Sequence, residues 1–65
     1  MARIAGVNLP SNKNLWIALT YIHGIGITTS KKIIAQAGLD PLKRVHELSE
    51  AEAIQLREII DANHM

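Results

Sequence analysis

Hydrophobic residues recur with helical spacing in three stretches of the chain, and each stretch predicts an amphipathic helix. The three stripes consist of Leu15, Ala18, Leu19 and Ile22, of Ser30, Ile33, Ile34 and Ala37, and of Ala53, Leu56, Ile59 and Ile60. The first helix is expected over about 14–23 and ends at Gly24. The second has Thr28 or Thr29 as its N-cap and closes at Gly38, because glycine suits the left-handed position after a helix.

Polar residues mark the starts of two further segments. Asp40-Pro41 is similar to an N-cap followed by proline at the first helical position, which predicts a short turn through Lys43-Arg44. Ser49 and Glu52 have the spacing of a capping box, in which each side chain bonds to the backbone N–H of the other residue. The third helix is therefore expected over 49–62.

The first fourteen residues have no helical period. They contain Gly6, Pro10 and the polar run 11–14, which together predict an extended arm that leads into a turn. The expected fold is an all-α, three-helix domain that occupies residues 1–65 as one unit. Its parts are the arm over 1–14, a helix pair joined by a glycine turn over 15–38, a connector over 39–48 and the third helix.

Length and composition narrow the classes of function. Ile, Leu and Val make up 19 of the 65 residues, enough for a thin core in one small domain. The absence of cysteine excludes disulfides, thiolate metal sites and a cysteine nucleophile. No apolar run approaches a membrane span, and no targeting segment is recognised. Since His23, His46 and His64 lack a metal-binding spacing and no catalytic constellation can be assembled, neither an enzyme nor a cofactor is expected.

The net charge of +1 conceals an uneven distribution along the chain. Residues 1–46 carry six Lys or Arg and one Asp, whereas residues 47–65 carry one Arg and five acidic residues. A polyanionic partner would therefore contact the first two-thirds of the chain.

Residues 19–34, LTYIHGIGITTSKKII, hold the one pattern with an evident chemistry. Gly24 and Gly26 allow a sharp turn with bare backbone, while Ile25 can point inward between the helices. Ser30 supplies the small residue that two closely crossing helices need. This layout resembles the helix-hairpin-helix family of nucleic-acid-binding motifs, which hold the phosphate backbone without reading bases.

The backbone after the glycine turn predicts a phosphate-binding site, because the first turn of a helix has unpaired N–H donors at its positive end. Lys31 and Lys32 can add charge-assisted contacts to neighbouring phosphates. The candidate nucleic-acid-binding residues are Arg3, Lys13, Gly24, Ile25, Gly26, Thr28, Thr29, Lys31 and Lys32. A purely structural turn between two helices would use the same glycines.

A second resemblance covers the whole chain. Its residues are the opening MARIAGVNLP, Ser30-Lys31, Ala37-Gly38, and Glu47-Leu48-Ser49-Glu50 followed by Leu56-Arg57. They are similar to the N-terminal half of the family of small-subunit ribosomal protein thirteen, of bacterial and organellar type. The resemblance implies a structural protein on the rRNA of the subunit head, in the cytoplasmic ribosome of a bacterium or in a mitochondrial or plastid ribosome. It also implies two neighbours, protein nineteen of the small subunit and protein five of the large subunit.

Two departures from that family change what is expected. Ile27 and Thr29 stand where the family usually has basic residues, which lowers the charge at the tip of the hairpin. The chain also ends near the end of the third helix, where the family continues into a long basic tail that reaches toward P-site tRNA. A form truncated in this way is not expected to contact tRNA.

The same residues leave two other functions open. One is a free-standing helix-hairpin-helix module that binds duplex DNA without sequence preference, and a preference for DNA over rRNA would favour it. The other is a protein-interaction domain in which the glycine turn is only structural. In that case Gly26→Ala would leave nucleic-acid binding unchanged.

Overall fold

The N-terminal segment folds back on itself instead of extending away from the helices. In the computed structural model, which describes residues 2–4 and 6–63, β1 (Ala2–Ile4) pairs antiparallel with β2 (Val7–Leu9). Gly6, in the two-residue link, has a φ of +78°, a conformation that favours glycine. Ile4 and Leu9 are 1% and 0% exposed. The hairpin thus supplies part of the core, and the prediction of an extended arm in an all-α fold is wrong for these residues.

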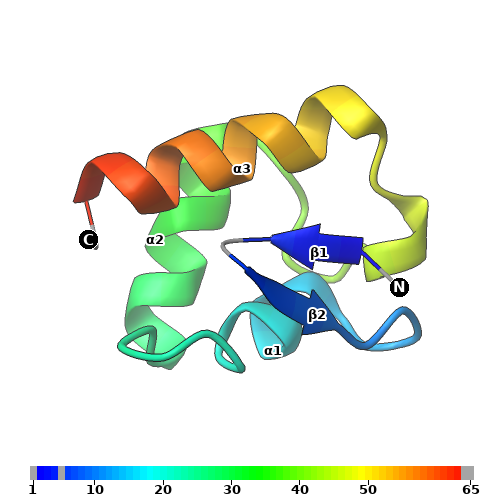
Figure 1. Cartoon of the computed structure of the whole chain (residues 1–65), viewed down its shortest axis with the longest axis horizontal. Helices are drawn as coiled ribbons and strands as arrows, with labels where there is room; N and C mark the ends of the chain where they lie inside the picture. The colour runs from blue at the N-terminus through cyan, green and yellow to red at the C-terminus, as the bar shows by residue number, and fades with distance from the viewer. Residues whose placement is uncertain (1, 5, 64–65) are drawn as a thin grey trace.

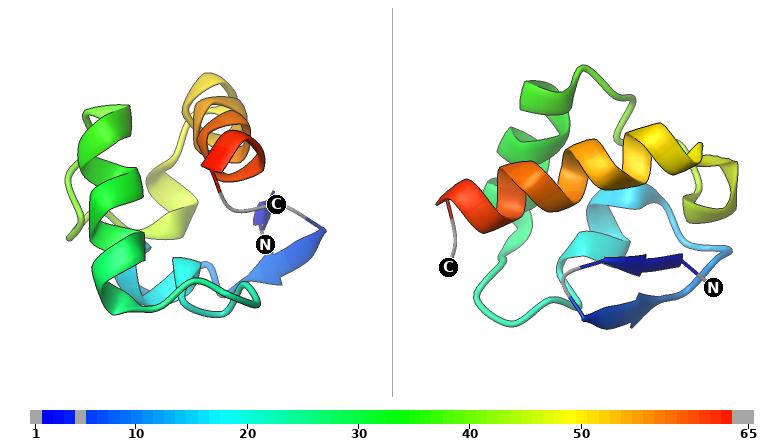
Figure 2. Two further views of the ribbon diagram at one scale, coloured as in Figure 1. Left: turned by 90° about the vertical axis from the view of Figure 1, so that its left-hand side faces the viewer. Right: turned by 45° about the horizontal axis from the view of Figure 1, so that its top comes forward.

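Three α-helices follow the hairpin, as predicted. They are α1 (Leu15–Leu19), α2 (Ile27–Ala37) and α3 (Glu50–Asn63), with a short 3₁₀ helix, η1 (Val45–Glu47), before α3. Helix α2 packs against both α1 and α3, and β1 lies next to α3 (Figures 1 and 2). Within the described part of the chain, no helix is long and apolar enough to cross a membrane.

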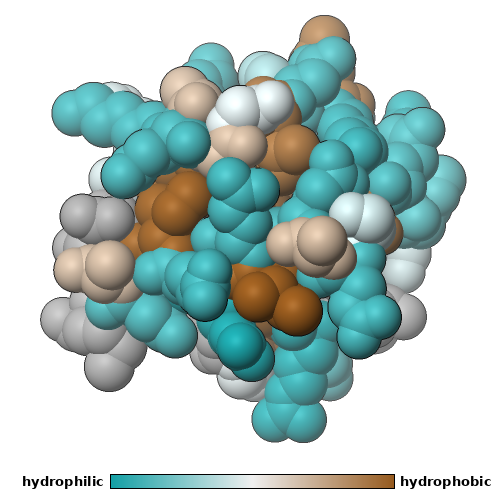
Figure 3. All heavy atoms as spheres, turned by 90° about the horizontal axis from the view of Figure 1, so that it is seen from above, coloured by the Kyte–Doolittle hydropathy of each residue, from teal (hydrophilic) through white to brown (hydrophobic). Residues whose placement is uncertain are grey.

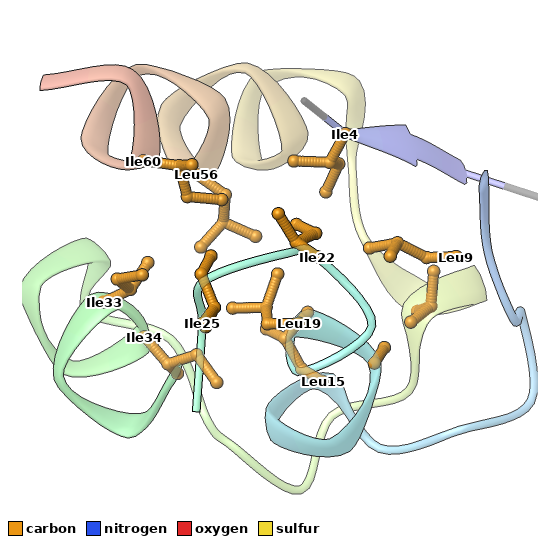
Figure 4. Packing of buried hydrophobic residues seen from close by; sticks show 12 residues of the cluster. Ile4, Leu9, Leu15, Leu19, Ile22, Ile25, Ile33, Ile34, Leu56 and Ile60 are labelled. Atoms are coloured by element: carbon orange, nitrogen blue, oxygen red, sulfur yellow. The ribbon is translucent and has the colours of Figure 1, made fainter. Parts of the chain in front are cut away.

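The three predicted stripes meet in one hydrophobic core. Figure 4 shows Leu56 and Ile60 pointing from α3 toward Ile25 and Ile33. The buried hydrophobic residues are Ile4, Leu9, Leu15, Ala18, Leu19, Ile22, Ile25, Ile33, Ile34, Val45, Leu56 and Ile60. The helical periodicity predicts most of this set. It does not predict the residues contributed by the hairpin and by η1.

Helix α1 is shorter than the predicted helix over 14–23. After Leu19, the N–H groups of Thr20, Tyr21 and Ile22 each donate to the carbonyl oxygen three residues earlier, at 3.0–3.1 Å. The chain therefore continues in tighter turns, a common way for a helix to end. Because these turns keep Ile22 buried, the predicted stripe is confirmed although the helix boundary is wrong.

Helix α2 begins earlier than predicted. Its N-cap is Gly26, in an extended conformation, and its first residue is Ile27. The N–H of Ser30 donates to the carbonyl oxygen of Gly26 at 2.9 Å, which places Thr28 and Thr29 inside the first turn. The prediction that one of these threonines is the N-cap is therefore wrong, and α2 has no side chain capping its first turn.

The capping predictions after α2 are confirmed. Gly38 closes α2 in the left-handed conformation, with a φ of +72°. Asp40 accepts a 2.9 Å hydrogen bond from the N–H of Leu42 at the start of a short turn. The N–H of Ser49 donates to Glu52 Oε1 at 2.9 Å, and the N–H of Glu52 donates to Ser49 Oγ at 3.1 Å. Both bonds of the predicted capping box are thus present.

Candidate nucleic-acid interface

The turn at 24–26, just before α2, has two exposed glycines on either side of one buried isoleucine. Ile25 is 5% exposed and lies beside Leu19 (Figure 4). Gly24 and Gly26 are exposed, and a Cβ built on either would meet nothing within 4 Å. Gly24 also has a φ of +87°, which favours glycine. The loop therefore offers open backbone on its outer side, as the sequence predicts.

The first turn of α2 presents unused donors next to this loop. The N–H groups of Ile27, Thr28 and Thr29 have no acceptor within the helix, since an α-helix leaves its first donors unpaired. No side chain caps them, and the first turn contains no acidic residue. The positive end of the helix dipole adds to their attraction for an anion. This geometry suits a phosphate oxygen.

Two lysines follow that first turn, in different surroundings. The ammonium of Lys31 lies 5.1 Å from the centroid of the Trp16 ring. Lys32 is exposed, and within the described residues neither lysine forms a salt bridge. Both cations are therefore available to an anionic partner. Trp16 itself is half-buried and packs against the core.

Ser30 fixes α2 against α1 at the base of the site. Its side chain is fully buried, and its hydroxyl donates a 2.7 Å hydrogen bond to the carbonyl oxygen of Trp16. The small residue predicted where the helices cross thus also forms a polar link between them. As a result, the first turn of α2 has a set position relative to α1.

Arg3 and Lys13 lie away from the glycine loop. Arg3, on β1, lines an open hollow of about 320 Å³ together with residues of α3. The carbonyl oxygen of Lys13 accepts a 3.2 Å hydrogen bond from the N–H of Val45, next to η1. In Figure 1 the segment that holds Lys13, between β2 and α1, lies to the right of α1, and the glycine loop lies to its left. Seven of the nine predicted site residues thus lie together at the glycine turn and the start of α2, and the two cations Arg3 and Lys13 lie elsewhere.

Lys43 and Arg44, which follow the short turn after Asp40, both have partners within the fold. Lys43 Nζ lies 3.0 Å and 3.1 Å from the two carboxylate oxygens of Glu52. The bond from the Ser49 N–H, and then Lys43, hold the pKa of Glu52 below its ordinary value. The guanidinium of Arg44 donates to the carbonyl oxygen of Asn12. Both side chains therefore serve the fold, and neither is a free extension of the basic surface.

Acidic residues concentrate on α3, apart from the glycine loop. Glu50, Glu58 and Asp61 are exposed there. Figure 3, which views the molecule from above, shows a largely hydrophilic face with separate hydrophobic spots. Among residues 2–4 and 6–63, no three His, Asp or Glu side chains come together as a metal site; His64 lies outside the described residues. The acidic side chains of α3 would repel an anion, whereas the first turn of α2 contains none. The first turn of α2 is therefore the better surface for an anion.

Comparison with known protein families identifies the family to which this sequence is similar. The family model described as ribosomal protein S13/S18 matches residues 3–65. The matched region contains the hairpin from Arg3 onward, the glycine loop and all three helices, so the geometry described above lies almost entirely within it.

Proposed function

Since the chain belongs to the ribosomal protein S13/S18 family, we propose that it binds small-subunit rRNA through backbone phosphates held at the N-terminal end of α2. Membership of the family makes the protein a structural component of the small ribosomal subunit, and hence of a ribonucleoprotein. The proposal adds the surface that meets the RNA and the groups that hold it.

One observation carries the proposal. Helix α2 begins at a glycine N-cap, so its first-turn donors are left without a side-chain acceptor. A Ser, Thr, Asp or Asn at this position could satisfy one of these donors with its side chain, whereas glycine has no side chain to do so. Together with α1 and the turn at 24–26, this start of α2 resembles the layout of a helix-hairpin-helix motif, which supports a phosphate as the missing acceptor.

The charge in this footprint comes from the second turn of α2. Ile27, at the first helical position, is an exposed apolar side chain and contributes no charge. Lys31 and Lys32 supply the positive charge instead. Each would contact a phosphate next to the one that the backbone N–H groups bind. Arg3 and Lys13 would contact separate phosphates, because they lie on other parts of the surface. Contacts of this kind position the protein on RNA and read no base.

Protein neighbours would occupy a different side. The acidic residues of α3 repel an RNA backbone, which favours a protein partner there. We include as part of the proposal the two neighbours that the family resemblance implies, protein nineteen of the small subunit and protein five of the large subunit.

Binding to small-subunit rRNA across a salt series tests the RNA footprint. The double variant Lys31→Glu/Lys32→Glu should bind much more weakly, and the slope of log K against log salt should fall by about two units or less. Arg57→Glu, on exposed α3 and away from the glycine loop, is the control for a single charge reversal, which is half the charge change of the double variant. An unchanged slope in the double variant would contradict the footprint. Stronger binding to duplex DNA than to rRNA would favour a DNA-binding module instead.

A further inference from the structure

Two consecutive residues of α2 contact the same residue of α1. Ser30 Oγ donates to the carbonyl oxygen of Trp16 at 2.7 Å, and the ammonium of Lys31 lies 5.1 Å from the centroid of the Trp16 ring. The N–H of Trp16 donates to the carbonyl oxygen of Pro41 at 3.3 Å, and its ring packs against the core. The ring under Lys31 is therefore held by α2, by the connector and by the core.

The contact with the ring orders Lys31 without neutralising its charge. A tryptophan ring attracts an ammonium through its quadrupole and carries no net charge. Lys43 shows the opposite case, because its ammonium is paired with the Glu52 carboxylate. Lysine has a long flexible stem, and a lysine that is held before binding loses less conformational freedom when it meets a phosphate. Lys31 is thus held by a neutral ring, and among the described residues it has no carboxylate partner.

The position of Lys31 places this charge near the proposed phosphate site. Lys31 comes four residues after Ile27, so the two exposed side chains lie on the same face of α2, one turn apart. We propose that Trp16 is a positioning residue, which holds the Lys31 ammonium beside the first turn of α2 for contact with a backbone phosphate. This inference rests on the proposed function and deepens it, because it gives a residue of α1 a role in a contact made by α2.

The neighbouring lysines provide matched variants for the test. The full chain is titrated with small-subunit rRNA over a salt series, as wild type, Lys31→Met, Lys32→Met, Trp16→Leu and Trp16→Phe, and as Trp16→Leu combined with each lysine variant. Trp16→Leu should weaken binding about two- to fivefold, the order of an exposed cation–π contact. When Trp16→Leu is combined with Lys31→Met, the affinity should fall no further than in Lys31→Met alone. When it is combined with Lys32→Met, the affinity should fall by the same two- to fivefold again. Trp16→Phe keeps an aromatic face and should retain most of the affinity.

A spectroscopic readout separates positioning from general stability. Trp16 is the only tryptophan of the chain, so its fluorescence reports on the Lys31 contact. Emission should change in Lys31→Met before RNA is added, should stay unchanged in Lys32→Met, and should change in the wild type on titration with rRNA. Circular dichroism of each variant shows that it is folded, and if Trp16→Leu does not fold, the emission of Lys31→Met, which keeps Trp16, carries the test.

Two results overturn the inference, and they differ from failure of the proposed function. The first is an equal loss from the Trp16 variant whether or not Lys31 is present. The second is unaltered emission in Lys31→Met. If neither lysine variant changes the salt slope, the phosphate footprint itself is wrong and the role of Trp16 falls with it. If both lysine variants lower the slope while the Trp16 variants bind like wild type, only the positioning role is refuted.

Discussion

The hydroxyl of Ser30 donates a 2.7 Å hydrogen bond to the carbonyl oxygen of Trp16, fourteen residues earlier in the sequence. Trp16 lies in the five-residue helix α1. Its carbonyl is one of the last four of the helix, which receive no hydrogen bond from within the helix. The bond therefore satisfies a carbonyl group at the end of one helix with a buried hydroxyl of the next. It also joins α1 to α2 directly behind the surface that the proposed function uses.

Ser30→Ala should lower the free energy of unfolding by about 1–3 kcal/mol, because the Trp16 carbonyl would lose the partly buried hydrogen bond from the Ser30 hydroxyl. Urea unfolding followed by circular dichroism measures this as a lower midpoint at an unchanged slope. Thr28→Ala removes a hydroxyl from the exposed side of the same helix and should change stability by less than about 0.5 kcal/mol. Equal midpoints for the two variants would show that the buried bond does not stabilise the fold.

Leu9→Ala should cost about 2–5 kcal/mol, because Leu9 is fully buried and its truncation leaves a cavity. A domain of this size buries little surface and is only marginally stable. The variant should therefore be largely unfolded, and most of its cooperative unfolding transition should be lost. Asn8→Ala, on the exposed side of the same strand, should have little effect in thermal unfolding. If Leu9→Ala melted like the wild type, the hairpin would be dispensable to the core.

Gly26→Asp and Gly26→Ser should separate stability from RNA binding. Gly26 has φ −88° and ψ −178°, a conformation that suits a capping side chain, and nothing lies within 4 Å of a built Cβ. Either variant should therefore stabilise the fold by a few tenths of a kcal/mol up to about 1 kcal/mol.

For rRNA binding the same two variants should diverge. The carboxylate introduced by Gly26→Asp would accept hydrogen bonds from the first-turn N–H groups and would repel a phosphate. Gly26→Ser adds no charge. Thermal unfolding and filter binding at one salt concentration compare them. A Gly26→Asp chain that binds rRNA as tightly as wild type would rule out phosphate contact at this turn.

Stability should fall in acid partly through Glu52. The Ser49 N–H and then Lys43 lower the pKa of Glu52 from its ordinary 4.5 in the folded chain, so the unfolded chain binds the proton more readily. The contribution of Glu52 is thus complete above the unfolded pKa and is lost as the pH falls through the lower folded pKa. Glu52→Gln should give a shallower decline of the urea midpoint below about pH 5 than the wild type.

Glu58→Gln is the matched control for this pH series, since it removes an exposed carboxylate of the same helix. Its urea midpoint should decline with acid as steeply as that of the wild type. A Glu52→Gln chain that followed the wild-type curve would show that the capping box and ion pair do not contribute to the acid response.

Local features of the fold follow from the sequence alone. The three apolar stripes, the Ser49/Glu52 capping box and the left-handed Gly38 depend on residues a few positions apart, and the structure contains each of them. The turn at 24–26 was also predictable, since two glycines around a buried isoleucine leave the backbone bare. These features need only helical periodicity and backbone chemistry, which act over one or two turns.

Other features were decided by tertiary structure, because they depend on partners distant in sequence. The Arg44–Asn12 bond spans 32 residues and the Lys43–Glu52 pair spans 9, so the sequence did not show that both cations are already engaged. The hairpin enters the core because α1 and α3 leave apolar surface that Ile4 and Leu9 cover. Lys31 and Lys32 are neighbours with the same chemistry, and packing of α2 on α1 alone brings one of them over Trp16. Short-range chemistry thus set the apolar faces of the three helices and the caps at Gly38 and Ser49, whereas long-range packing set the place of the hairpin and which of the charges remain free to bind.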